Sequence, residues 1–211
     1  QPAVMKALLE KTEGKIKPSA IPLWSVMMAR HLTLLNASYF DAQRQRTEAD
    51  DEMKIQNSLI EIIEQANGYP ETLFMSIVAG ADLFVDLDFC IDVLRLLAVS
   101  EFGLRESDLH NLLGQKWDAL KWAETRRYLG PLLNVHDENG IIDFTYPNFR
   151  SELCVQAGDN LGPYLVALAD YMHHIVANNS LDLVANRELP YIALKTQSTE
   201  LLDLVVMSRG H

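Results

Sequence analysis

Apolar residues recur at intervals of three and four along most of the chain, and proline or glycine stands where the pattern breaks. This spacing is typical of helices that bury one face. In the first part of the chain we expect helices over about residues 2–14, 19–35, 55–66 and 70–83, with an exposed loop or helix start over 41–51. Ser19 is the predicted N-cap of the second helix, whose wide apolar face predicts that it is buried.

The stretch from residue 87 to 155 has a different pattern. Residues 89–99 are apolar on nearly all sides, which predicts the core helix of a small domain. Further helices are expected over 105–113 and 117–129, followed by strands over 132–136 and 141–145. Asn139-Gly140 between the strands is a strong turn signal, so we expect positive φ at both residues. Three helices followed by a hairpin is the order of elements in a winged helix.

The pattern after the hairpin is helical again. Helices are expected over 147–156, 161–176, 187–195 and 199–207. The last two contain more apolar residues than two exposed helices need, which indicates the start of a helical-hairpin array. The predicted fold class is therefore mostly α with one β-hairpin, and the predicted domains are residues 1–86, 87–157 and 158–211.

Composition and charge exclude some classes of function. The 211 residues are 48% hydrophobic and 22% charged, which is ordinary for a globular protein. The net charge is -11, whereas a non-specific nucleic-acid binder needs a basic surface. Within the predicted winged helix acidic residues outnumber basic ones, and Asp137 and Glu138 in the wing would repel phosphates. The charge therefore disfavours nucleic acid as a partner.

The cysteines and the apolar runs indicate the cellular compartment of the protein. Cys90 and Cys154 both lie in apolar runs, which favours buried thiols and a reducing compartment over a disulfide framework. No apolar run reaches about 18 residues, and no basic-then-apolar leader is present. We therefore expect an intracellular, cytoplasmic protein with no membrane partner. Because the chain opens with Gln1 in a helical pattern, we expect a piece of a longer protein.

Four stretches carry a resemblance to a known family. They are Leu94 to Leu109, Ile21 to Trp24, Trp122 to Leu133 continued by Phe144 to Arg150, and Arg187 to Tyr191 continued by Leu201 to Leu204. In order and spacing they resemble segments of NACHT-type STAND ATPases, the group with telomerase-associated and nephrocystin-like members. The resemblance implies a helical lid over 1–86, a winged helix over 87–157 and the start of a helical-repeat tail over 158–211.

The resemblance also implies a nucleotide switch. In this family a nucleotide-binding domain, a lid and a winged helix close over ADP and open with ATP, so the intact protein would bind ATP or ADP with Mg. Pro22 matches the lid proline that packs on adenine, and Tyr146 stands where relatives commonly have a phosphate-facing histidine. The alternative interpretations are that Pro22 is a first-turn proline of a helix and that Tyr146 is a packed aromatic.

Motifs for catalysis are absent from the sequence. The only Gly-Lys pair is Gly14-Lys15, with Leu9 five residues before Gly14 and Ile16 in the Ser/Thr position, so no phosphate-binding loop is present. The six histidines show no dependable metal spacing with one another or with cysteine or carboxylate residues. We therefore expect no catalytic residue, no metal site and no cofactor in this chain, which would not be an enzyme by itself.

The leading hypothesis is a non-catalytic regulatory segment of a STAND-type NTPase. Its partners would be its own nucleotide-binding domain and helical-repeat tail, with a protein ligand as a further candidate. Two alternatives stay open. One is a winged-helix DNA-binding regulator, and the other is a helical adaptor that binds another protein through the tail.

Overall fold

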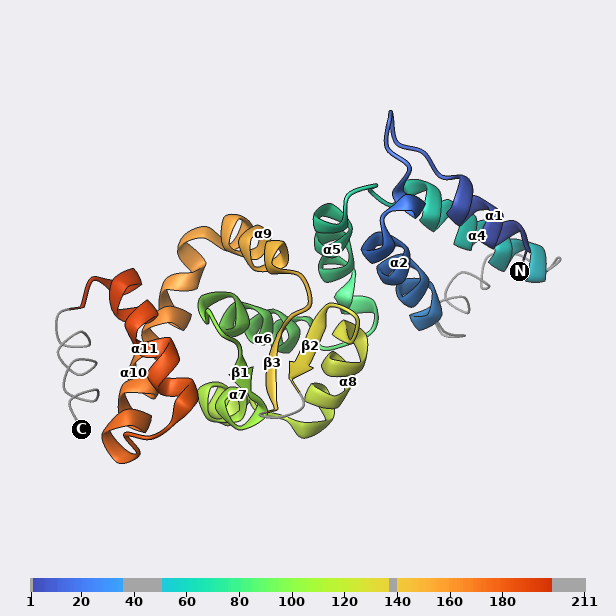
Figure 1. Cartoon of the computed structure of the whole chain (residues 1–211). Coiled ribbons are helices and arrows are strands. Elements are labelled where there is room, and N and C mark those ends of the chain that lie inside the picture. The colour runs from blue at the N-terminus through green and yellow to red at the C-terminus, as the bar shows by residue number, and fades with distance from the viewer. Residues whose placement is uncertain (1, 36–50, 137–139, 199–211) are drawn as a thin grey trace. The chain divides into compact units, whose positions relative to one another are not determined.

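The computed structural model describes residues 2–35, 51–136 and 140–198. The fold is mostly helical with one small antiparallel sheet, which confirms the predicted fold class (Figure 1). The chain divides into two compact units, unit 1 over Gln1–Val85 and unit 2 over Asp86–His211.

Unit 1 is built from helices. They are α1 (Pro2–Glu10), η1 (Pro18–Ala20), α2 (Pro22–Leu34), α4 (Asp51–Gln65), α5 (Pro70–Ala79) and η2 (Ala81–Leu83). Helix α1 packs against α4, and α2 packs against α5. Trp24 is fully buried, and its indole N–H donates to the Asn67 carbonyl oxygen at 2.7 Å. This bond ties α2 to the segment between α4 and α5.

The start of α2 differs from the prediction. Ser19 lies inside the short 3-10 helix η1 and does not cap α2, and its hydroxyl donates to the Leu9 carbonyl at 2.9 Å. Ile21 is extended, with φ -98° and ψ 105°, and the helix begins at Pro22. The physical reason is that a residue before proline is disfavoured in the helical region, so Pro22 sets the boundary.

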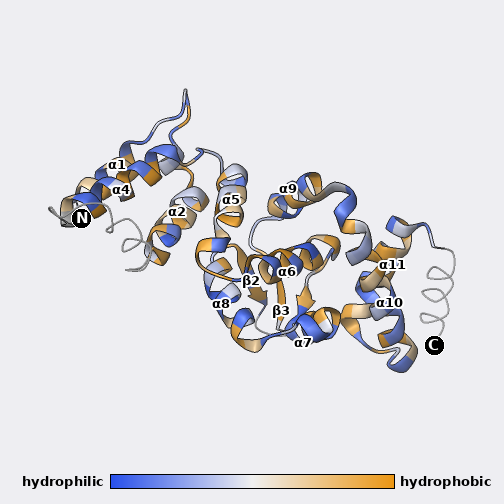
Figure 2. Cartoon of the chain, turned by 180° about the vertical axis from the view of Figure 1, so that it is seen from behind, coloured by the Kyte–Doolittle hydropathy of each residue, from blue (hydrophilic) through white to orange (hydrophobic). Residues whose placement is uncertain are grey.

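Unit 2 begins with a central helix, α6 (Leu87–Val99), which packs against α7, α8, α9, α10 and β3. The other elements are β1 (Leu104–Arg105), α7 (Glu106–Leu113), η3 (Gly114–Lys116), α8 (Ala119–Leu129), β2 (Leu133–His136), β3 (Ile141–Phe144), α9 (Pro147–Ala157), η4 (Gly158–Leu161), α10 (Gly162–Asn178) and α11 (Leu183–Thr196). Phe89, Leu94 and Leu97 on different sides of α6 are all buried, as its all-round apolar pattern predicts. Figure 2 shows β3 in the hydrophobic colour beside this helix.

The sheet has three strands in the order β1-β3-β2. The predicted hairpin is present, with Leu133 opposite Phe144 and His136 opposite Ile141. The additional strand β1 pairs Leu104 with Ile142. It was not predicted, because two residues carry no periodicity.

The turn of the hairpin is longer than a two-residue turn, since His136 pairs with Ile141 and four residues lie between them. Gly140 has φ +61°, and its N–H donates to the His136 carbonyl at 2.8 Å, so the prediction of positive φ at Gly140 is correct. The same prediction for Asn139 lies outside the described residues.

A second glycine, Gly103, lies in the turn after α6 and approaches strand β3 closely. Gly103 has φ +80°, and a Cβ at this position would overlap the Ile142 carbonyl oxygen. Only glycine combines this backbone conformation with so close an approach. The turn over residues 100–103 is therefore fixed against β3.

The last described helix also begins earlier than expected. Asp182 caps α11 by accepting a hydrogen bond from the Ala185 N–H at 2.9 Å, so the helix starts at Leu183, not near Arg187. Pro190 lies within α11. The prediction of a helix over 199–207 lies outside the described residues.

Candidate functional site

The first predicted site residue, Pro22, is the exposed first residue of α2 in unit 1. Its ring replaces a backbone N–H that would have no partner inside the helix, and its φ suits a helix start. This placement fits the first-turn interpretation. Nothing else in the described part of unit 1 assigns it a ligand.

The second predicted site residue, Tyr146, is the half-buried N-cap residue of α9 in unit 2. Its ring packs edge-on against Phe149, with centroids 5.5 Å apart, and its hydroxyl accepts a hydrogen bond from the Asn148 side-chain amide at 3.0 Å. Tyr146 is thus a packed aromatic whose hydroxyl has a neighbour on its own helix. Pro22 and Tyr146 belong to different units, and each is placed only within its own.

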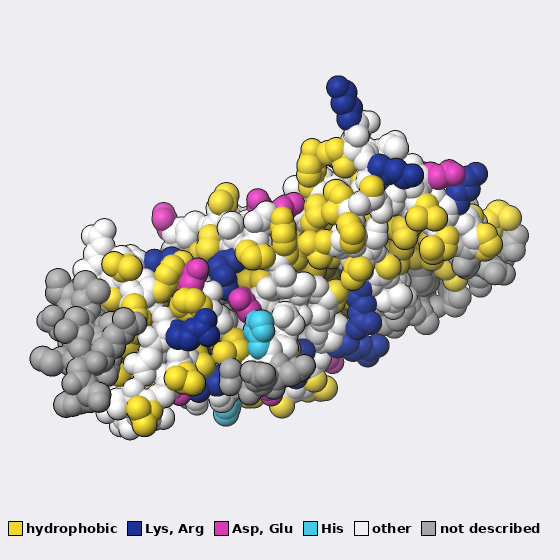
Figure 3. Space-filling model, viewed as in Figure 1, with side chains coloured by type: hydrophobic (Ala, Val, Ile, Leu, Met, Phe, Trp, Pro, Cys, Tyr) yellow, Lys and Arg dark blue, Asp and Glu magenta, His cyan; other side chains and the backbone are white. Residues whose placement is uncertain are grey.

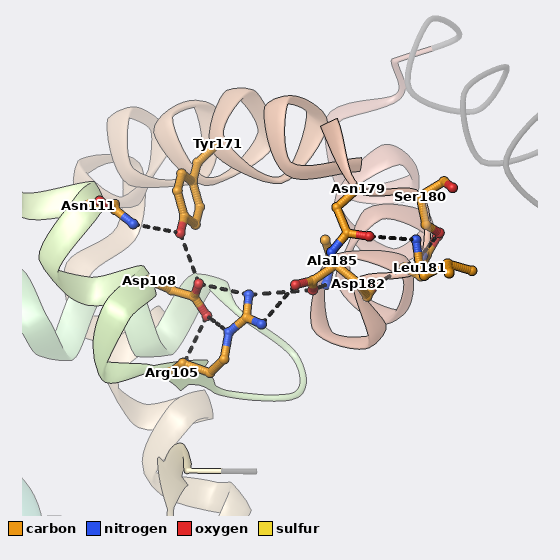
Figure 4. Close-up of polar contacts among 10 residues, drawn as sticks. Arg105, Asp108, Asn111, Tyr171, Asn179, Ser180, Leu181, Asp182 and Ala185 are labelled. Atoms are coloured by element: carbon orange, nitrogen blue, oxygen red, sulfur yellow. Dashed lines mark hydrogen bonds and ion pairs between the residues drawn. The ribbon is translucent and has the colours of Figure 1, made fainter. Parts of the chain in front are cut away.

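A polar cluster of unit 2 is centred on Arg105, at the junction of β1 and α7 (Figure 4). Arg105 donates from Nε to Asp108 at 2.9 Å and from Nη1 to Asp182 at 2.8 Å. Asp108 is almost fully buried and also accepts the Arg105 backbone N–H at 2.9 Å. One guanidinium therefore joins the start of α7 to the start of α11.

The surroundings of the cluster keep Arg105 and Asp182 ionised. The Asp108 hydrogen bond is the main reason that the pKa of Arg105 is raised, although burial opposes it. Burial disfavours the charge on Asp182, but the Ala185 N–H and Arg105 together lower its pKa. Both side chains therefore stay ionised, and the pair is preserved across the physiological pH range.

Tyr171 brings α10 into the same cluster. Its hydroxyl donates to Asp108 at 2.9 Å and accepts from the Asn111 amide at 3.1 Å. Burial raises the pKa of Tyr171 to about 12, against the effect of Asn111. Tyr171 thus remains a neutral donor, and the cluster connects α7, α10 and α11.

A second attachment uses a buried carboxylate on α11. Glu188 is fully buried and accepts hydrogen bonds from the Ser100 hydroxyl at 2.6 Å, the Glu101 N–H at 3.0 Å and the Phe102 N–H at 2.6 Å. Burial raises its pKa, and the three hydrogen bonds oppose that rise. The neighbouring Arg187 guanidinium lies 4.4 Å from the centroid of the Phe102 ring. One face of α11 therefore holds the turn that also contacts β3 through Gly103.

These two clusters were not predicted from the sequence. Glu188 lies in the buried stripe of α11, between Ala185 and Ile192, and a carboxylate among apolar positions is a signal of a buried, hydrogen-bonded charge. For Arg105 the signal is weaker, since a surface arginine near an aspartate is common.

Other groups with possible chemistry have structural surroundings. Burial raises the pKa of the Cys90 thiol to about 12, so it is not a reactive thiolate at neutral pH. Within the described residues no group of three histidine, cysteine or carboxylate side chains could hold a metal ion. Of the helices that the structure describes, none has the length and apolarity needed to cross a membrane.

Comparisons of the chain with protein-family models, with curated proteins and with solved structures found no match. The arrangement itself shows what these polar groups do. They join helices that lie far apart in the sequence, so residues 86–198 hold together through charged and hydrogen-bonded attachments as well as through the apolar core.

Proposed function

We propose that this chain is a non-catalytic regulatory segment of a STAND-type NTPase switch, with a lid over 1–86, a winged helix over 87–157 and the start of a helical-repeat tail over 158–211. The observation that carries this proposal is the element order α6-β1-α7-α8-β2-β3 with the sheet order β1-β3-β2. A winged helix needs this order, in which the first strand adds to a C-terminal hairpin. The acidic composition favours a protein partner for it over nucleic acid.

An exposed apolar surface on unit 1 supports docking to another domain. Figure 3 shows hydrophobic side chains gathered on the visible face of this unit. Val26 on α2 is 58% exposed, and Leu9 on α1 is 53% exposed. Exposed apolar side chains of this kind favour binding to another protein. In the proposed switch this surface packs on the nucleotide-binding domain when ADP is bound.

The nucleotide would be held mainly by that other domain. The intact protein would bind ATP or ADP with Mg, and Pro22 and Tyr146 are the residues of this chain proposed to approach it. Because this sequence has no phosphate-binding loop, the chain by itself is expected to bind ATP weakly if at all.

The test is a binding experiment with the nucleotide-binding domain of the intact protein, loaded either with ADP or with a non-hydrolysable ATP analogue. The chain should bind the ADP-loaded domain more tightly, as measured by calorimetry. Val26→Asp should weaken this binding, whereas Leu181→Asp, at an 82% exposed position of unit 2, is the matched control. Equal affinity for both nucleotide states, or micromolar ATP affinity of the chain alone, would contradict the proposal.

The DNA-binding alternative depends on the cations of α8. Lys121 is bonded to Asp86 at 2.6 Å, and Arg126 lies 3.6 Å from Glu106, so two of these cations face carboxylates. Arg127 is exposed. An electrophoretic shift with duplex DNA at low salt would favour this alternative. Binding of an unrelated protein through α10 and α11, without any dependence on nucleotide, would favour the adaptor.

A further inference from the structure

A cavity of about 550 Å³ that is widely open to solvent lies in unit 2 where α6 and η3 meet η4 and α10. Its volume is within the range of small-molecule sites. Leu96, Leu112, Leu113 and Pro163 contribute apolar lining from elements on both sides of residue 158. The cavity therefore lies between the proposed winged helix and the proposed tail.

The polar part of the lining is organised around Asp92, which is 8% exposed. One carboxylate oxygen accepts the Tyr164 hydroxyl, and the other accepts the Lys116 ammonium at 2.6 Å. Both oxygens are engaged, and the charge of Lys116 balances that of Asp92. The Asp92 carboxylate therefore presents no unpaired negative charge to the cavity.

Arg95 provides the second cation of the lining. Its guanidinium lies over the Tyr164 ring, 5.5 Å from the centroid, and Nη1 donates to the Tyr164 hydroxyl at 3.3 Å. Among the described residues no carboxylate forms an ion pair with Arg95. The second carboxylate of the lining, Asp159, belongs to an exposed residue of η4. The stacked guanidinium therefore has N–H donors for an anionic ligand group.

We propose that this cavity binds a small monocarboxylate with an apolar body. Arg95 recognises the carboxylate, because guanidinium and carboxylate match in charge and in donor geometry. The leucines of α6 and α7 and Pro163 contact the apolar body. A ligand in this place touches both α6 and α10, so its binding stabilises the packing of the tail helices on the rest of unit 2. This site does not depend on the proposed switch function.

The test uses hexanoate as the probe, with hexan-1-ol and hexylamine as controls for the apolar body and for the charge. Calorimetry on the full chain should show hexanoate binding, with a rise in the unfolding midpoint and slower amide exchange in α10. The alcohol and the amine should bind at least about tenfold more weakly, since they lack the charge-assisted bond. Equal binding of the three probes, or no binding of hexanoate, would overturn the proposal.

Two variants separate the site from general effects on folding. Arg95→Met should weaken hexanoate binding by at least about tenfold. Ala167→Phe fills the cavity from an exposed lining position without removing a charged group, and it should abolish binding. Val166→Phe, next to it on α10 but outside the lining, is the control and should bind normally. Unchanged hexanoate affinity in Ala167→Phe would show that the ligand binds elsewhere.

Discussion

The Glu188 carboxylate of α11 accepts a hydrogen bond from the Ser100 hydroxyl at 2.6 Å, although 88 positions separate the two residues in the sequence. The same carboxylate accepts two backbone N–H groups of the turn after α6. A buried charge that satisfies three donors both fixes this turn and anchors α11.

Removal of this carboxylate should therefore destabilise unit 2. Glu188→Ala leaves the buried Ser100 hydroxyl and two partly buried backbone N–H groups without this acceptor, and we expect a loss of about 2–4 kcal/mol in the free energy of unfolding. Chemical denaturation followed by circular dichroism measures it. Glu152→Ala, on α9, is a suitable control, and an equal effect of the two substitutions would contradict the anchoring role.

The charge on Glu188 should also make stability depend on pH. Burial raises its pKa above the ordinary 4.5, despite the hydrogen bonds from the turn and the nearby positive charge of Arg150. The folded chain then keeps the proton to higher pH than the unfolded chain, so the stability contribution falls as pH rises from about 4.5 through the raised pKa. Unfolding free energies of the wild type and Glu188→Gln, measured across this window, should diverge with that sign. Parallel curves would show that Glu188 is not the group responsible.

Unit 1 should respond to pH in the opposite direction. Burial lowers the pKa of His31 below 6.5, its Nδ1 has no hydrogen-bond partner among the described residues, and its ring lies edge-on to Phe84. The unfolded chain therefore takes up a proton first, and stability is lost as pH falls from about 6.5 through the lowered pKa. The amide protection factors of α2, which remove the pH dependence of intrinsic exchange, should fall as pH falls over this range in the wild type. They should not do so in His31→Phe, which keeps the aromatic contact.

Gly103 and Gly140, the positive-φ glycines near the sheet, allow the effect of backbone strain to be compared with that of steric overlap. Gly140→Ala introduces only backbone strain, because a Cβ there has nothing within 4 Å, and should cost about 1–2 kcal/mol. Gly103→Ala adds an overlap with the β3 backbone and should cost at least about 3 kcal/mol. Denaturation midpoints of the two variants test this. Similar losses would mean that the turn over 100–103 can move away from β3.

The guanidinium geometry of Arg105 can be tested by a conservative change. Arg105→Lys keeps the charge but loses the planar guanidinium whose Nε, Nη1 and Nη2 bond Asp108 and Asp182 at once, and we expect a loss of about 1–3 kcal/mol. Arg126→Lys alters a half-exposed ion pair with Glu106 and should change stability by less than about 0.5 kcal/mol. Amide exchange at the start of α11 should increase only in the first variant.

The sequence allowed prediction of features that depend on neighbouring residues. The all-round apolar pattern of 89–99 predicted a buried central helix, and Gly140 predicted a positive φ at the end of the hairpin turn. Where two local signals competed, the predicted helix boundary was wrong by a few residues. Ser19 was a plausible cap, but Pro22 forces Ile21 into an extended conformation and so determines where α2 begins.

The polar clusters could not be predicted in this way, because their partners are distant in the sequence. Arg105 and Asp182 are 77 positions apart, and no local pattern pairs a given arginine with a given aspartate over that separation. Pro22 and Tyr146 came from the resemblance, and their nucleotide roles stay predictions. The structure adds that Tyr146 is packed against Phe149.

The strand order β1-β3-β2 also determines the order in which the sheet can assemble. The middle strand is the last in the sequence, and β2 meets it through a short connection, so hairpin closure has a low entropic cost. Strand β1 has two residues and pairs only with β3, which makes its loop much longer and its own pairing weak. We therefore expect the hairpin to form first and β1 to add to it. On unfolding we expect β1 to detach first, and the turn held by Glu188 to separate from β3 before the hairpin opens.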